Sequence, residues 1–372
     1  MLYVDIPHRS EIEQLIAYRG PACLSIYLPT TPVTQDAQAD RIALKNLAKT
    51  GLDQLRAAEV DKRELWPIEE EIDDLVEDDE FWRFQARSLA LFATPERIVT
   101  FRLPNALTAM VEASDRFHLK PLLRSVTWPQ TAYVLALSQN AVRVVEVSGD
   151  LPAATVKVDG MPTDAASAVG KASILGRSPS GRLQGSEGQK VRLRQYARQV
   201  DHALRGLIHG RETPLILAAH PPLESIYRSV NTYPHLVAQS IGGNAETTSD
   251  ADLAAAARKI LDALHRAELE SLHALFDARS KAGRATNDIA QAARAATFGA
   301  IDTLLVDIDE VIPGTVGEDG SVTLKDGPCA ESYGVVDEIA GRAFASGARV
   351  LGVRRADIPG GASLAAILRY AF

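Results

Sequence analysis

One segment differs so much from the rest of the chain that it limits what the sequence around it can fold into. Residues 170–211 carry nine Lys and Arg side chains and only two acidic ones, Glu187 and Asp201, in a chain of 372 residues with a formal net charge of −8. The part from Gly176 to Gly188 is rich in Gly and Ser and contains Pro179. Such a composition cannot pack a core, so we expect a long loop here.

A helix is expected directly after this loop. Apolar residues recur at spacings of four and three and form one stripe: Leu193, Ala197, Val200, Leu204 and Leu207. Lys190, Arg194 and Arg198 recur every fourth residue on another face. A glycine loop that opens such a helix brings backbone N–H groups and cations together, which suits phosphates. A solvated helix face would give the same pattern, but the contrast with the acidic remainder favours nucleic acid.

The overall composition restricts where such contacts can lie. Hydrophobic residues make up 46% and charged residues 24% of the chain, as in soluble globular proteins, and the length suits two or three domains. No stretch is apolar for long enough to span a bilayer. Asp5, Glu11 and Glu13 lie where a signal peptide needs an apolar core, so a cytoplasmic protein without membrane contact is expected. With a pI of about 5.6, contact with RNA must be focused on one region.

Residues 1–126 are expected to form an α+β domain. Strands are predicted at Cys23–Leu28, Ser88–Ala93 and Ile98–Leu103, and long helices at Asp36–Ala58 and Glu64–Glu80. The second helix is rich in carboxylates, and no His accompanies them. We therefore interpret them as a solvated face and not as an acid-base pair or a metal site.

Residues 127–280 alternate strand and helix and predict an α/β domain. The expected elements are a hairpin of Ala132–Leu137 and Ala141–Val147, the basic helix, a buried strand Pro214–Ala219 and a long helix Ser249–Arg279. His220 follows the carboxyl end of the buried strand, where α/β sheets place ligands. It is a candidate site residue on that ground, and a structural turn histidine is the alternative.

Residues 281–372 are expected to form a small α/β/α sandwich. The predicted elements are helices Thr286–Phe298 and Val335–Ala345 and strands Ala300–Ile308, Arg349–Val353 and Ile367–Tyr370.

Several common catalytic motifs are absent from the sequence. Gly185-Ser-Glu-Gly-Gln-Lys190 misses the phosphate-loop spacing, and no GxGxxG follows a strand. There is no GxSxG, no HExxH, and no companion at ligand spacing for Cys23 or Cys329. We therefore expect no ATP site, no metal site, no cofactor and no ordinary hydrolase nucleophile.

Four segments resemble the archaeo-eukaryotic peptide-chain release factors and their relative Pelota, most closely the bacterial branch of that family. Residues 117–147 look like the passage into the family's ribonuclease H-like middle domain. Residues 186–204 are similar to its GGQ loop and following helix, with the family's Tyr-x-Arg-x-Val pattern at Tyr196–Val200. Residues 288–306 and 364–370 resemble its third domain, which has an L7Ae-like fold.

The resemblance implies a protein that enters the ribosomal A site, contacts ribosomal RNA and peptidyl-tRNA, and meets a translational GTPase such as elongation factor Tu. In true release factors the Gln of the triplet positions water against the peptidyl-tRNA ester, a role that would fall here to Gln189 with Gly188. Glu187 replaces the first glycine of the family's triplet, and a carboxylate is repelled by RNA phosphates. The Asn-Ile-Lys-Ser motif for stop-codon reading has no counterpart at 34–46.

These observations leave three hypotheses. The first is a non-hydrolytic, Pelota-like factor that binds the ribosomal A site in ribosome rescue, the response to stalling or hibernation. The second is an active peptidyl-tRNA hydrolase that uses Glu187-Gly188-Gln189. The third, an RNA-binding or nuclease domain unrelated to ribosomes, lacks the metal-binding carboxylates of a ribonuclease H-like nuclease. Either of the first two assigns the phosphate contacts to Arg177, Arg182, Lys190, Arg192, Arg194 and Arg198.

Overall fold

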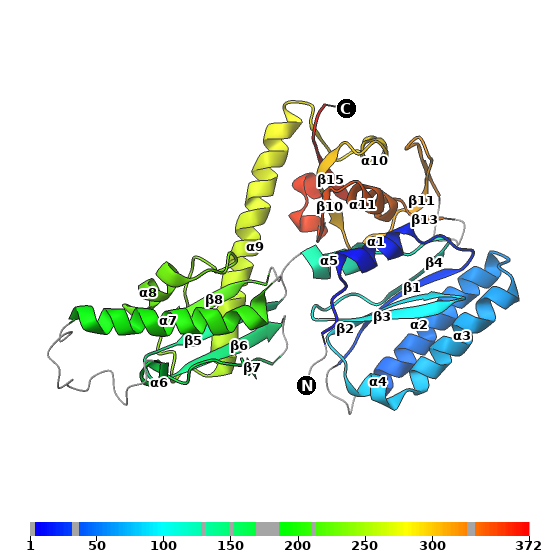
Figure 1. Cartoon of the computed structure of the whole chain (residues 1–372). Coiled ribbons are helices and arrows are strands. Elements are labelled where there is room, and N and C mark those ends of the chain that lie inside the picture. The colour runs from blue at the N-terminus through cyan, green and yellow to red at the C-terminus, as the bar shows by residue number, and fades with distance from the viewer. Residues whose placement is uncertain are drawn as a thin grey trace. The chain divides into compact units, whose positions relative to one another are not determined.

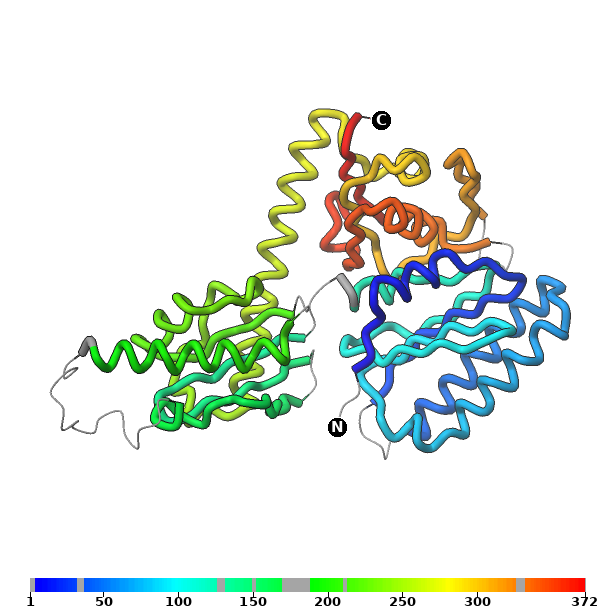
Figure 2. Tube along the Cα trace, viewed as in Figure 1, coloured from blue at the N-terminus to red at the C-terminus, as the bar shows by residue number. Residues whose placement is uncertain are grey.

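The computed structural model shows a mixed α/β protein with several sheets. It describes residues 4–31, 37–127, 131–148, 152–168, 186–209, 213–325 and 332–371. The chain divides into two compact units, one formed by Met1–Trp128 together with Arg266–Phe372 and the other by Pro129–His265 (Figures 1 and 2). The first unit combines both ends of the chain. The expected division into three domains, 1–126, 127–280 and 281–372, stays a prediction.

The amino-terminal part of the first unit is built on an antiparallel sheet with the strand order β3-β2-β1-β4. The strands are β1 (Cys23–Pro29), β2 (Ser88–Thr94), β3 (Arg97–Leu103) and β4 (Met110–Ser114), and the helices are α1 (Arg9–Ala17), α2 (Ala37–Ala57), α3 (Lys62–Glu77) and α4 (Asp79–Arg83). Side chains of β1 alternate between two cores, with Leu24 and Ile26 in the core that includes α2 and α3 and Tyr27 in the other. The three strands expected from the sequence are confirmed. Strand β4 was not expected, because Glu112 interrupts its apolar pattern.

The acidic helix expected at Glu64–Glu80 is in fact two helices. Asp61 caps α3 by accepting a hydrogen bond from the Arg63 N–H at 2.9 Å. Asp78 accepts from the N–H groups of Glu80 and Phe81, each at 2.9 Å, and so starts α4. The cap at Asp78 thus ends the first helix before the carboxylate run is complete.

The carboxyl-terminal part of the first unit contains a sheet with the order β14-β10-β15-β9 and a small sheet with the order β12-β11-β13. The strands are β9 (Ala285–Thr286), β10 (Ile301–Asp307), β11 (Pro313–Val316), β12 (Val322–Leu324), β13 (Tyr333–Gly334), β14 (Arg349–Val353) and β15 (Leu364–Leu368). The helices are α10 (Ile289–Thr297), α11 (Val335–Ala345) and the short 3₁₀ turns η2 (Arg355–Asp357) and η3 (Pro359–Gly361). The larger sheet packs α10 and α11 on one face and the end of α9 (Asp250–Ser280) on the other. Both layers of helices agree with the expected sandwich.

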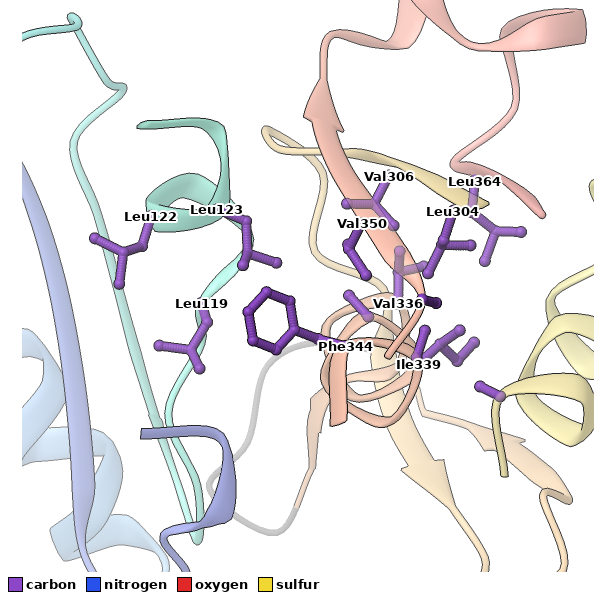
Figure 3. Packing of buried hydrophobic residues seen from close by; sticks show 14 of the residues in the cluster. Leu119, Leu122, Leu123, Leu304, Val306, Val336, Ile339, Phe344, Val350 and Leu364 are labelled. Atoms are coloured by element: carbon purple, nitrogen blue, oxygen red, sulfur yellow. The ribbon is translucent and has the colours of Figure 1, made fainter. Parts of the chain in front are cut away.

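One core joins the two parts of the first unit. Figure 3 shows Leu119, Leu122 and Leu123, in and beside α5 (Lys120–Thr127), facing Phe344 of α11. Beside this core Asp337 Oδ1 accepts hydrogen bonds from the N–H groups of Leu119 and Lys120, each at 2.7 Å. The buried Lys120 ammonium donates in turn to the Asp307 carbonyl at 2.8 Å. The start of α5 is therefore fixed to the carboxyl-terminal part by apolar packing and by paired polar groups.

The second unit contains a sheet with the order β7-β6-β5-β8. The strands are β5 (Thr131–Leu137), β6 (Val142–Ser148), β7 (Ala154–Val156) and β8 (Leu215–Ala219), and the helices are α6 (Ala165–Ala168), α7 (Ser186–Ile208), α8 (Leu223–Val230) and the first half of α9. The β5–β6 pair is antiparallel, which confirms the expected hairpin, whereas β8 is parallel to β5. One face of the sheet packs against α6, α7 and α8, and the other against α9.

Candidate nucleic-acid interface

Helix α7 buries one face in the core of the second unit. Leu193, Ala197, Val200 and Leu204 are buried as expected, whereas Leu207 is only partly buried and Ile208 lies in the core beside it. Tyr196 is also fully buried, although we did not assign it to the stripe. Its position three residues after Leu193 and four before Val200 is the signal that would have placed it there.

The Glu187-Gly188-Gln189 triplet lies in the first turn of α7 and not in a loop, so the expected GGQ-like loop is wrong at this point. Ser and Glu are favourable at the start of a helix, because its first N–H groups lack intrahelical partners and its dipole attracts negative charge. One glycine costs a helix only about 1 kcal/mol, which the following apolar face offsets. Within this turn Gly188 is buried and Gln189 is half-buried.

Three basic residues of α7 form an exposed row along the helix. Lys190, Arg194 and Arg198 are exposed and follow one another every fourth residue, a rise of about 6 Å per step. Arg192 is half-buried, and the remaining expected contacts, Arg177 and Arg182, lie outside the described residues. Among the residues that the structure describes, Arg194 and Arg198 form no ion pair. Their guanidinium groups are available to an external anion.

Two polar side chains lie on the buried side of α7. Asp201 accepts hydrogen bonds from Thr232, 3.0 Å from its N–H and 2.8 Å from its hydroxyl, and pairs with Arg205 at 3.3 Å. These contacts fix the helix to the segment after α8. The hydroxyl of Tyr196 has no hydrogen-bond partner within the described part of the chain, and burial raises the pKa of this phenol. The Tyr-x-Arg-x-Val pattern thus combines two core residues, Tyr196 and Val200, with one surface cation, Arg198.

The carboxyl ends of β5 and β8 lie at the same edge of the sheet, because the two strands are parallel. A hollow of about 460 Å³ lies there, lined by residues 137–140, 220–223 and 244–246. We call it the edge hollow. His220 lines it, as its position after a buried strand suggested. The contribution of 244–246 could not be expected, since these residues come from a segment without a sequence signal.

The connection from β5 to β8 also places the start of α7 at this edge. A helix that precedes a strand and packs on the sheet runs against the strand direction, so its amino end lies where the strands end. Helix α7 has 23 residues, a length of about 35 Å, whereas β5 has 7 residues and spans about 23 Å. Figure 1 shows the amino end of α7 continuing past the sheet. The triplet and the edge hollow therefore belong to the same end of the unit.

Two absences hold for the described residues. Across the described ranges, no three His, Cys, Asp or Glu side chains are grouped so that they could hold a metal ion. The helices in these ranges include none long and apolar enough to cross a membrane.

Comparison with solved structures finds several termination-like factors. The archaeal translation termination factor aRF1 shares 15% identity over 98% of this chain and 99% of its own, with a TM-score of 0.25. Ribosome-bound archaeal Pelota (15% identity, 74% of this chain and 72% of its own) and Dom34 of S. cerevisiae (12%, 74% of each) both have TM-scores of 0.40. Scores this low do not establish a common overall arrangement.

Comparison of the sequence with curated proteins finds no match. A family model, in contrast, matches residues 129–267, which contain the strands, the basic helix and the edge hollow described above. The model is that of the bacterial archaeo-eukaryotic release factor family 11. The resemblance expected from the sequence is therefore confirmed, because residues 129–267 of this chain match the bacterial branch of the archaeo-eukaryotic release factors.

Proposed function

We propose that this release-factor-like protein binds the ribosomal A site and acts in ribosome rescue, in the response to stalling or in hibernation. The observation that carries the proposal is the exposed row of Lys190, Arg194 and Arg198 on α7, within the region that matches the family. Cations on a rigid helix bind a phosphate backbone at a small cost in conformational entropy, because only their own side chains become ordered. The acidic remainder of the chain restricts such binding to this helix.

The proposal includes a finer assignment of the fold. We assign the second unit to the family's ribonuclease H-like middle domain and the carboxyl-terminal part to its L7Ae-like domain. The mixed sheet of the second unit and the sheet between two helix layers in the first are compatible with these assignments. The proposed partners are ribosomal RNA, peptidyl-tRNA and a translational GTPase such as elongation factor Tu. Among the similar structures, Pelota is described as ribosome-bound and Dom34 as interacting with Hbs1.

The alternative is an active peptidyl-tRNA hydrolase that uses Glu187-Gly188-Gln189. In its favour, Gln189 is only half-buried and lies in the first turn of α7, next to the exposed Lys190. Against it, the helical conformation does not present the triplet as a turn that could approach an ester closely. We therefore rank the binding function first, with Gly188 and Gln189 as the residues that would act if hydrolysis occurs.

The test of the binding function is sedimentation with ribosomes, either vacant or carrying peptidyl-tRNA, over a series of salt concentrations. If three cations of α7 contact phosphates, the logarithm of the binding constant should fall with the logarithm of salt with a slope of about −2 to −3. The absence of co-sedimentation at every salt concentration would contradict the proposal.

The test of the alternative is release of labelled peptide from stalled ribosomes by the native protein, by Gln189→Ala and by Gln195→Ala. Gln195 is an exposed glutamine of the same helix and serves as the matched control. If Gln189 takes part in hydrolysis, Gln189→Ala should lose activity and Gln195→Ala should keep it. Equal release by all three proteins would exclude a role for Gln189 in catalysis.

A further inference from the structure

We propose that the edge hollow binds a single unstacked nucleobase of an RNA strand. The hollow lies in the second unit, and its volume of about 460 Å³ is within the range of small-molecule sites, about 300–1,000 Å³. Three separate chain segments converge on it, and each contributes both apolar and polar residues. The assignment to a base rests on the chemistry of this lining.

The apolar part of the lining suits a flat ring. The exposed Pro221 and Pro222 at the start of α8 supply this surface, and the buried Leu137 and Leu223 lie behind them. The imidazole of His220 lies at the same place and is exposed. Bases that leave a stack are commonly held between apolar or aromatic side chains in proteins that recognise single-stranded RNA.

The polar part of the lining offers a donor and an acceptor of the kind that base edges require. The Asn140 amide N–H donates to Glu246 at 3.0 Å, and this leaves its Oδ1 as an acceptor. Asn244 Oδ1 accepts from the Glu246 N–H at 3.0 Å, and this leaves its Nδ2 as a donor. Amide side chains and carboxylates recognise bases through such donor and acceptor pairs.

The charge of the lining disfavours a phosphate. None of the described residues that line the hollow is Lys or Arg, and Glu246 contributes a carboxylate. An anionic group would be repelled there, whereas a neutral base is not. The cations lie instead on α7, whose amino end is at the same edge of the sheet. A strand whose phosphates follow α7 would thus have, at its end, a hollow that is lined by amides and one carboxylate.

For the identity of the strand this inference rests on the proposed function, but binding of a base does not depend on the ribosome. The first experiment is therefore saturation-transfer NMR of the full chain with adenosine, guanosine, cytidine and uridine, at low and high salt. At least one nucleoside should receive saturation at its base protons, and the effect should persist at high salt because no lining residue is cationic. Ribose alone should receive none. Absence of transfer to every nucleoside, or equal transfer to ribose, would overturn the proposal.

Variants test whether the nucleoside binds in the edge hollow. Asn244→Asp keeps the acceptor for the Glu246 N–H and removes the free donor, and it should weaken nucleoside binding about tenfold or more, as expected for one lost base contact. His220→Ala should weaken binding as well. Asn46→Asp makes the same change at an exposed position of α2 and should have no effect. Unchanged binding by both hollow variants would assign the base to another site.

The source of the base is tested with a single-stranded RNA octamer that carries 4-thiouridine. After irradiation, cross-linked peptides should contain residues 137–140, 220–223 or 244–246, and Arg194→Glu should reduce their yield. Cross-links confined to other peptides would contradict the proposal. If the protein binds nucleosides but does not sediment with ribosomes, the base site stands and the proposed function fails. The opposite result retains the function and removes the base site.

Discussion

Helices α3 and α7 have the same design and opposite exposed charges. Each buries an apolar stripe, Leu65, Ile68 and Ile72 in α3 and Leu193, Val200 and Leu204 in α7. Carboxylates of α3 pair with the neighbouring α2, as Asp73 does with Lys45 at 3.1 Å and Glu69 with Arg56 at 3.0 Å. Arg194 and Arg198 of α7 make no ion pair among the described residues.

The comparison shows that a charged helix face can either form ion pairs within the fold or stay available to an external partner. In α3 part of the charge is used within the fold, where exposed pairs contribute about 0–1 kcal/mol each. In α7 the fold leaves Arg194 and Arg198 to an external partner. The apolar faces of the two helices, in contrast, should contribute equally to the free energy of unfolding.

The largest effects are expected on the apolar faces. Leu204→Ala in α7 and Ile68→Ala in α3 should each lower the free energy of unfolding by about 3 kcal/mol, because both side chains are fully buried and leave cavities. Urea unfolding measures the two changes. Val191→Ala is the control, because this α7 side chain is 53% exposed and should change stability by less than about 0.5 kcal/mol. A loss in Leu204→Ala as small as that of the control would mean that α7 is not held by its apolar face.

The second effect separates a tertiary anchor from a local cap. Asp201→Asn should cost about 2 kcal/mol, because Asp201 accepts from both the N–H and the hydroxyl of Thr232, and an amide cannot replace both acceptor oxygens. Asp61→Asn should change stability little, because Asn caps a helix about as well as Asp. The measurement is again urea unfolding. Equal losses would show that the Thr232 contacts do not stabilise α7 more than an ordinary cap stabilises α3.

The third prediction concerns the two exposed faces. The double change Arg194→Glu and Arg198→Glu should weaken ribosome binding about tenfold or more and flatten its salt dependence, because two phosphate contacts are lost. The control change in α3, Glu70→Lys with Glu71→Lys, alters the net charge by the same amount with the opposite sign, at two exposed positions. It should leave binding and its salt slope unchanged. Sedimentation with ribosomes over a salt series compares the two. A gain of binding in the α3 variant that mirrors the loss in the α7 variant would indicate a response to net charge and not to the α7 face.

Most of the features of the two helices could be predicted from the sequence, because the spacing of apolar residues indicates which positions are buried. The stripe through Leu193, Val200 and Leu204 and the helix after the Gly-rich stretch are found where expected. The ends of the helices were harder to predict. Helix propensity is too weak at the start of α7 to predict that the helix includes the triplet. Similarly, the cap at Asp78 decides that α3 ends there and a new helix begins, and the spacing of apolar residues does not report it.

The candidate site was only partly predictable, for a different reason. The cations of α7 are local in sequence, and so is His220 at the end of a strand. The edge hollow depends on residues more than a hundred positions apart, such as Asn140 and Glu246, which a hydrogen bond brings together. No spacing in the chain records such a contact, because it follows from the pairing of β5 with β8 and from the path after α8.

The smallest effect tests whether the buried face of α7 is only structural. Tyr196→Phe should leave stability unchanged or raise it by about 1 kcal/mol, because it removes a buried hydroxyl that has no partner in the described structure. Tyr27→Phe is the matched change, and it should cost about 1 kcal/mol because the Tyr27 hydroxyl donates to the His118 carbonyl at 2.7 Å. Both are measured by urea unfolding, followed by ribosome sedimentation. If Tyr196→Phe keeps its stability but loses ribosome binding, the Tyr196 hydroxyl serves the interface, and the division of α7 into a structural and a functional face fails.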